Sequence, residues 1–232
     1  MFAVPFSVRL NRARLVLALL PAVLLWVAPA THAQFGAPPT TPVHDAMALK
    51  PPAGARVAIV EFEDLQCPDC ARANPLLIEA SAKYNIPWVR HDFPLPFHNW
   101  SFQAAVNARF FDTKSQKLGN DYRDYIFANQ ISIETPDALR DWTQKFAAAH
   151  NVALPFAIDP MGKFAGEVKA DYALGQKVGI EHTPTIWVVT NAKNAPPFVE
   201  VVDRTKLYQL IDDMLQQAGP ATPATTTRAK TQ

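Results

Sequence analysis

Two cysteines, Cys67 and Cys70, are the only ones in the sequence, and they are separated by Pro68 and Asp69. An apolar run over residues 57–60 precedes them and is typical of a buried strand, and a helical pattern follows at once. We therefore expect Cys67 at a helix N-terminus, where free backbone N–H groups and the helix dipole favour a thiolate. The thiolate is the reactive form of cysteine, and Cys70 stands one turn further on. This spacing predicts thiol–disulfide exchange.

Two other uses of a cysteine pair fit the sequence less well. Half of a zinc site would need partners, because a tetrahedral site takes about four ligands. The sequence has no second CxxC and no Cys/His pair at ligand spacing, so we expect no metal. A structural disulfide across two residues would close only a tiny loop and stabilise little.

The N-terminal residues 1–33 are typical of a secretory signal peptide. Arginines between residues 9 and 14 precede an apolar stretch over residues 15–28, and small residues follow, with cleavage expected after Ala33. The alternative is an uncleaved N-terminal anchor. Either way the domain is expected outside the cytoplasm, in the periplasm or secreted, where disulfides persist.

Length and composition favour one domain with room for an insertion. The chain has 232 residues, is 49% hydrophobic and carries a formal net charge of +1. This balance gives no reason to expect nucleic acid or an anionic membrane as a partner.

The pattern before residue 98 indicates the first half of an α/β core. Residues 34–55 are rich in Pro, Ala and Thr and predict a linker. Strands are expected over 57–63 and 86–93, parallel because a helix over 68–84 connects them, and Pro75 should kink that helix.

The chain then turns helical before strands return. Helices are expected over 100–111, 122–129, 136–150 and 161–178, strands over 185–189 and 198–202, and a closing helix over 205–217. The third helix has an N-cap at Thr135 and Pro136 at its first position. The composition of residues 219–232 predicts a disordered tail. The order is β-α-β, a helical insertion, then β-β-α.

In this order and spacing, the sequence resembles the thioredoxin-fold superfamily and, within it, the DsbA-like secreted thiol–disulfide oxidoreductases. Four features carry the resemblance: the CxxC at 67–70, Glu61 six residues before it, the segment FPLPFHNWSFQAA at 93–105, and VGIEHTPT at 178–185. The resemblance implies a thioredoxin-like α/β fold, with a central mixed sheet flanked by helices. Its core would span residues 56–97 and 161–218, with an all-helical subdomain inserted at 98–160.

The resemblance implies roles for three residues on the first strand and helix. Cys67 would be the nucleophile and Cys70 the resolving thiol. Glu61 would be a buried proton acceptor for Cys70, with its pKa raised by burial. The alternative is an acid at the strand edge that faces water, because Glu63 shares the same face.

The resemblance also implies a loop beside the cysteines. Pro184 would follow a cis peptide bond, and Thr183 would offer its backbone to an extended substrate. From the residues alone, a trans turn before a strand is the alternative. His182 could tune the thiolate, or be a surface histidine without a catalytic part.

The dipeptide between the cysteines, Pro68 and Asp69, departs from the strongest oxidants of the family, which have a histidine beside the second cysteine. An ionised Asp69 would oppose a thiolate at Cys67. We therefore predict a higher pKa for Cys67, and a less oxidising protein, than in a histidine-bearing relative.

The function expected from these features is that of an exported thiol–disulfide oxidoreductase, acting as an oxidase of cysteines in secreted or periplasmic proteins. A membrane quinone-linked thiol oxidase would recharge it. No cofactor is expected, because the dithiol carries the electrons. The alternatives are a reductase or isomerase of the same fold, and a non-catalytic chaperone or binding module.

Overall fold

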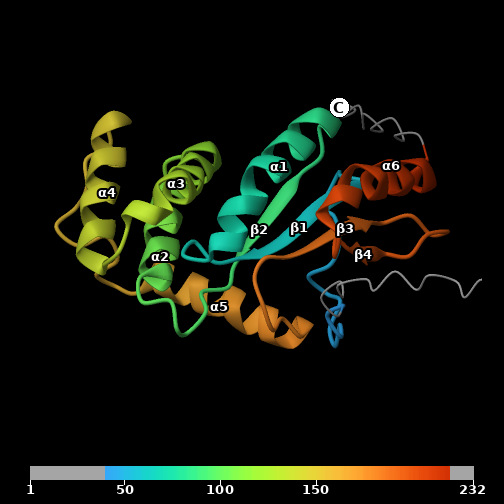
Figure 1. Ribbon diagram of the computed structural model, residues 1–232, viewed down its shortest axis with the longest axis horizontal. Helices are drawn as coiled ribbons and strands as arrows, with labels where there is room; N and C mark the ends of the chain where they lie inside the picture. The colour runs from blue at the N-terminus through green and yellow to red at the C-terminus, as the bar shows by residue number, and fades with distance from the viewer. Residues whose placement is uncertain (1–39, 220–232) are drawn as a thin grey trace, which may run out of the picture. The chain divides into compact units, whose positions relative to one another are not determined.

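The computed structural model describes residues 40–219. The expected signal peptide and the tail beyond Gly219 lie outside these residues. Four strands form one mixed sheet in the order β2-β1-β3-β4 (Figure 1): β1 Val57–Glu63, β2 Trp88–Asp92, β3 Thr185–Thr190 and β4 Phe198–Glu200. β1 and β2 are parallel, as predicted, and β3 is antiparallel to both of its neighbours.

The helices occupy the places that the sequence pattern predicted, with shifts at their ends. They are α1 Pro68–Tyr84, α2 Ser101–Asp112, α3 Gln116–Asn129, α4 Pro136–Ala149, α5 Lys163–Val178 and α6 Leu207–Ala218, with short 3-10 turns η1 Gln130–Ser132 and η2 Arg204–Lys206. The order β-α-β, helical insertion, β-β-α is confirmed.

Both faces of the central strands are covered, which explains why β1 is buried along its whole length. On one face, Leu77 of α1 and Ile211 of α6 pack with Ile59 of β1. On the other face, α5 covers Val60 and Trp187. A strand buried on both sides needs an almost continuous apolar run, and this is the pattern from which β1 was predicted.

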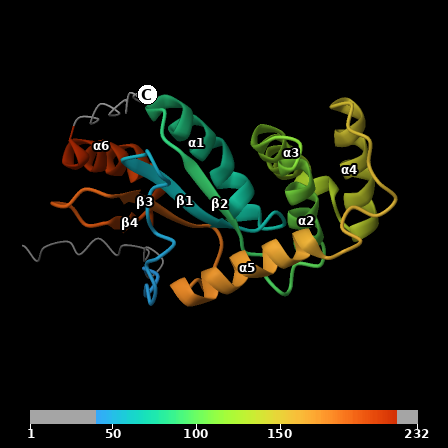
Figure 2. The same cartoon turned by 180° about the vertical axis from the view of Figure 1, so that it is seen from behind.

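The helical insertion has an aromatic core of its own. Trp100, Phe111, Tyr122 and Phe146 are buried together between α2, α3 and α4. α5 packs against α2 at one end and reaches the sheet at β2 (Figure 2). The insertion is therefore attached to the core by a helix that belongs to both.

Buried ion pairs join the insertion to the sheet. The Arg90 guanidinium on β2 donates to both carboxylate oxygens of Glu63 at 2.8–3.1 Å and to Asp124 of α3 at 2.9 Å. Arg123 of α3 forms a bidentate pair with Asp112 of α2 at 2.8 Å. We call these five residues the interior ion cluster.

α3 begins six residues earlier than predicted. The side chain of Ser115 accepts a hydrogen bond from the Leu118 N–H and caps the helix. Gly119 lies in the first turn, where a Cβ would stand 1.7 Å from an oxygen of Asp112. The missing side chain of Gly119 makes room for Asp112, which pairs with Arg123.

The prediction of a linker over residues 34–55 is wrong for the part that the structure describes. Leu49 is buried against the sheet. Thr41 donates to the Glu200 carboxylate through its N–H and hydroxyl at 2.7 and 2.9 Å, and the His44 N–H donates to the Val178 carbonyl at 2.9 Å. A few anchoring contacts fix a segment whose composition alone is typical of a linker.

None of the helices in residues 40–219 has the length and apolar character needed to cross a membrane.

Candidate active site

The two cysteines lie at the start of α1, directly after β1 and a short loop. Cys67 is the N-cap residue in extended conformation, and Pro68 occupies the first helical turn, where its missing N–H costs no hydrogen bond. Both are free thiols in the structure. Cys67 keeps 7% of its surface exposed, whereas Cys70 is fully buried. A second protein could therefore reach Cys67 but not Cys70.

The surroundings of Cys67 favour its thiolate. A hydrogen bond from the Cys70 thiol lowers the pKa of Cys67 most. The side chain of Thr183 and the backbone N–H groups of Cys70 and Asp69 lower this pKa further. Together they outweigh burial and lower the pKa of Cys67 to about 6. This is the effect expected of a cysteine at a helix N-terminus.

The surroundings of Cys70 have the opposite effect. Burial, the hydrogen bond with Cys67 and the nearby charge of Glu61 raise the pKa of Cys70 well above its ordinary value. The Asp64 N–H approaches its sulfur at 3.5 Å. The pair therefore consists of one thiol that ionises readily and one that keeps its proton.

Glu61 is buried, with 1% of its surface exposed, so the alternative of an edge acid facing water does not fit. Its carboxylate accepts one side-chain hydrogen bond, from the Trp88 indole N–H at 3.0 Å. Burial and the charge of Glu63 raise the pKa of Glu61, against the opposing charge of Arg90. A carboxyl that holds a proton next to Cys70 has the properties of a proton donor and acceptor, and that role stays a prediction.

The loop before β3 lies against Cys67. The peptide bond between Thr183 and Pro184 is cis, and the Cys67 thiol donates to the Thr183 carbonyl at 3.2 Å. The Thr185 hydroxyl closes a turn on the His182 carbonyl at 2.6 Å. Pairing of β3 with β1 brings these two distant segments together. The contact of Thr183 with substrate stays a prediction.

His182 is exposed. It lines a small cleft of about 190 Å³ together with Asp69, Pro184 and Arg204. The structure thus places His182 beside the site, and a tuning role for it stays a prediction.

Asp69 is paired, which sequence reasoning did not foresee. Arg72 of α1 contacts its carboxylate at 3.0 Å, and Arg204 of η2 contacts the same oxygen at 2.7 Å. The predicted difference from histidine-bearing relatives stays a prediction, and the two arginines offset part of the Asp69 charge on which it depends.

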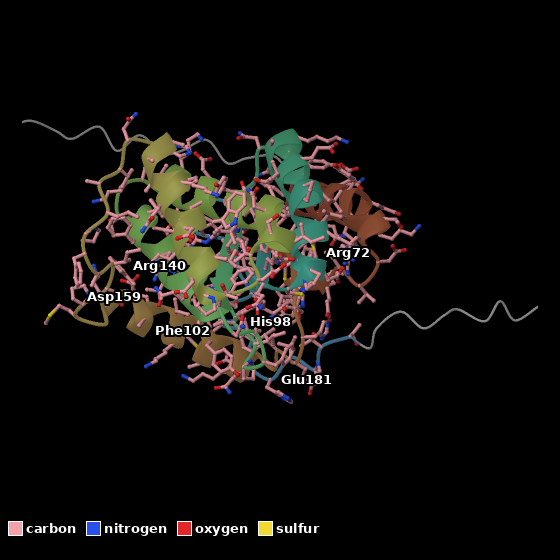
Figure 3. The ribbon with its side chains drawn as sticks, turned by 60° about the vertical axis from the view of Figure 1, so that its left-hand side comes forward. Arg72, His98, Phe102, Arg140, Asp159 and Glu181 are labelled. Carbon is pink, nitrogen blue, oxygen red and sulfur yellow. The ribbon has the colours of Figure 1, made fainter. Side chains whose placement is uncertain are left out.

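Asp64 is a residue of the site that the sequence analysis did not identify. Its buried carboxylate accepts hydrogen bonds from the Leu95 N–H at 2.6 Å and from the Ser101 hydroxyl. The same carboxylate contacts His98 Nδ1 at 2.7 Å. His98 lies on the segment that leads into α2, away from Arg72 on α1 (Figure 3). Asp64 therefore links the loop that carries the cysteines to the start of the insertion. An acid directly after a buried strand and before the CxxC was the available signal.

Within residues 40–219, no three His, Cys, Asp or Glu side chains gather in a way that could hold a metal ion.

Comparison with known protein families decides the relationship. The family described as Thioredoxin matches residues 52–204, about two thirds of the chain. The chain belongs to the thioredoxin family. No curated protein matches the sequence.

Solved structures of thioredoxin-fold proteins agree with this assignment. Alpha-DsbA1 of Wolbachia pipientis is 18% identical, with a TM-score of 0.58 over 73% of this chain and 90% of its own. DsbA2 of Pseudomonas aeruginosa is 21% identical, with a TM-score of 0.53 over 73% and 94%. A periplasmic thioredoxin-like protein from Salmonella enterica serovar Typhimurium is 18% identical, with a TM-score of 0.56 over 72% and 87%. At these identities the likeness is one of fold: a DsbA-like thioredoxin fold with its helical insertion.

Proposed function

We propose that this protein is an exported DsbA-like thiol–disulfide oxidoreductase that acts as an oxidase of cysteines in client proteins. One observation carries the proposal: the two thiols of the CxxC differ in accessibility and in pKa. Cys67 is reachable and has a pKa of about 6, whereas Cys70 is buried and its pKa is raised. This asymmetry assigns different steps of exchange to the two sulfurs.

The reaction begins with the oxidised protein, in which Cys67 and Cys70 form a disulfide. A client thiolate attacks Cys67 Sγ, a client–Cys67 bond forms, and Cys70 leaves with the electron pair of the broken bond. The client's second thiolate then attacks the client sulfur of the mixed disulfide and expels Cys67 as a thiolate. The client gains a disulfide and the protein is left as the dithiol, so two electrons have moved from client to protein.

Protons move with these steps. The Cys70 thiolate is disfavoured by burial, so it needs a proton as it leaves. Glu61 is the buried carboxyl beside it, and burial raises its pKa well above the ordinary value, which favours the protonated form that can donate. We assign to Glu61 the delivery of that proton and its recovery when the disulfide is restored.

The low pKa of Cys67 supports the proposed direction of electron flow. A thiolate that the protein stabilises is a good leaving group, which speeds release of the oxidised client. Stabilising this thiolate also stabilises the dithiol form relative to the disulfide, which makes the disulfide a stronger oxidant. Both effects favour an oxidase over a reductase.

The compartment and the partners complete the proposal. Residues 1–33 would direct export, and the clients would be secreted or periplasmic proteins with reduced cysteines. A membrane quinone-linked thiol oxidase would take the electrons from the dithiol and restore the disulfide, so the protein itself needs no further cofactor.

The test mixes the oxidised protein with a reduced, unfolded model client that has two cysteines. We expect stoichiometric oxidation of the client by the wild type and none by Cys67→Ala. Cys70→Ala cannot form the internal disulfide, so it is first converted to a Cys67–glutathione mixed disulfide. A client with a single cysteine should then displace glutathione and stay joined to Cys67. Equilibration with glutathione gives the reduction potential, and a strongly reducing value would favour the reductase alternative. Client refolding that survives Cys67→Ala would favour a non-catalytic chaperone instead.

A further inference from the structure

We propose that Arg204 is a positioning residue for the redox pair, which holds the peptide bond between Asp69 and Cys70 against Cys67 and offsets the charge of Asp69. The inference deepens the proposed function and concerns the same site. Arg204 lies 135 positions after Asp69 in the chain, on η2 at the start of the closing helical segment.

The contact has two points. Arg204 Nη2 donates to the Asp69 carboxylate at 2.7 Å, and Nη1 donates to the Asp69 backbone carbonyl at 3.2 Å. A guanidinium presents its N–H groups in a rigid planar fork, so two contacts fix both the position and the orientation of the group it holds. The arginine therefore holds the backbone of the dipeptide as well as a side chain.

The Asp69 carbonyl that Arg204 holds and the Cys70 N–H lie in one planar peptide group. This N–H lies in the first turn of α1, directly after the Cys67 N-cap. It makes no cap hydrogen bond to the sulfur in the structure, but it is among the groups that lower the pKa of Cys67. A cation at the oxygen end polarises the peptide group and strengthens the effect of its N–H on a thiolate. Through this peptide, Arg204 reaches Cys67 without touching it.

The second contact acts through charge. An unopposed carboxylate at Asp69 would disfavour a thiolate at Cys67. Arg72 also pairs with this carboxylate, but it is 68% exposed, compared with 35% for Arg204, and its hydrogen bond goes to the carboxylate only. Arg72 thus provides a natural comparison, because it places a similar charge next to the Asp69 carboxylate but makes no hydrogen bond to the Asp69 backbone carbonyl.

The experiment replaces Arg204 by Gln and follows the Cys67 thiolate by its ultraviolet absorbance as a function of pH. We expect the titration to move to higher pH in Arg204→Gln. The glutathione equilibrium should shift toward the disulfide about two- to fivefold, the range expected for a partly exposed charge. Arg72→Gln should give a clearly smaller shift, and Arg204→Lys, which restores the charge but not the fork, an intermediate one.

The control is Arg140→Gln, which removes an exposed arginine of α4 far from Arg72 (Figure 3). It should leave the titration unchanged, and circular dichroism should show that all variants fold. An unmoved titration in a folded Arg204→Gln protein overturns the inference, as does a shift equal to that of Arg72→Gln. The titration needs no client, so a wild type that fails to oxidise clients would count against the proposed function alone.

Discussion

Charged residues serve two regions of this molecule in opposite ways. At the redox corner, which we define as Glu61, Cys67, Asp69 and Arg204, charges are unevenly matched. In the part of the chain that the structure describes, Glu61 has no cation in hydrogen-bond contact, and the partners of Asp69 are partly exposed to solvent. In the interior ion cluster, Arg90 holds Glu63 through three hydrogen bonds out of solvent.

The contrast is sharpest along β1, where Glu61 and Glu63 share one face and are both buried. Glu63 receives a guanidinium, and Glu61 receives only an indole N–H. Burial raises the pKa of both carboxyls, but the charge and hydrogen bonds of Arg90 oppose the rise at Glu63, and the rise is larger at Glu61. The unmatched group is the one that can do chemistry, and the matched group fixes the frame around it.

The largest effect on stability is expected from Glu63→Gln. Arg90 cannot give up its charge, and within residues 40–219 the carboxylate that stays in contact with this buried cation is the partly exposed Asp124. We expect the free energy of unfolding to fall by about 3 kcal/mol, measured by denaturant titration of the disulfide form.

Its control is Glu167→Gln, which removes an exposed acid paired with Lys163 at 4.0 Å. That change should stay within about 0.5 kcal/mol. If Glu63→Gln were equally neutral, the interior ion cluster would not be what holds the insertion to the sheet.

A smaller effect of opposite sign is expected from Glu61→Gln. The pKa of Glu61 is raised in the folded protein, so ionisation opposes folding at every pH above the pKa of an unfolded glutamate. Gln removes this cost and can still accept the Trp88 N–H, so the free energy of unfolding at pH 7 should rise by about 1 kcal/mol or more. Client oxidation should slow by about tenfold or more, because Cys70 loses its proton donor.

Stability and oxidation rate are measured on the same preparation, again with Glu167→Gln beside it. A variant that loses stability would show that Glu61 is ionised and paired in the native state. A variant that gains stability and oxidises clients at the wild-type rate would remove Glu61 from the mechanism.

The sequence was sufficient for the parts of this comparison that depend on local pattern. The buried run of β1, the cysteine spacing and the proline at the first turn of α1 placed Cys67 at a helix N-terminus. The segment around Pro184 could be placed beside it only through the resemblance, because residues 67 and 183 meet through strand pairing between β1 and β3. Spacing along the chain carries no information of that kind.

The partners of the charges could not be predicted, and the reason is physical. Nothing in the sequence indicates the partner of Asp69, because Arg204 follows it by 135 residues and lies beside it only in the folded chain. Residues 40–55 have the composition of a linker, and composition does not reveal that Leu49 packs against the hydrophobic side chains of the sheet. Long-range pairing was therefore the missing information at both places.

A pH effect follows from the lowered pKa of Cys67. The folded dithiol form gains stability from this thiolate; the gain is complete only above the pKa of an unfolded cysteine and is lost as pH falls through about 6. The disulfide form has no such group. We therefore expect the stability of the dithiol form, relative to the disulfide form, to fall by about 1 kcal/mol between pH 7 and pH 5. A difference that stays constant over this range would mean that Cys67 titrates as an ordinary thiol.

The smallest effect is expected from Arg72→Gln, and it tests whether the redox corner depends on its charges for stability. Arg72 is largely exposed, and Arg204 still holds Asp69 when it is gone. The free energy of unfolding should therefore change by only about 0.3 kcal/mol, and the change should shrink as salt is added. A loss above about 1 kcal/mol would place Asp69 and its arginines with the interior ion cluster, and the division between charges that hold the frame and charges that tune the sulfurs would fail. A small loss, accompanied by a measurable shift of the Cys67 titration, would show that a charge can act on the chemistry of this site while contributing almost nothing to its stability.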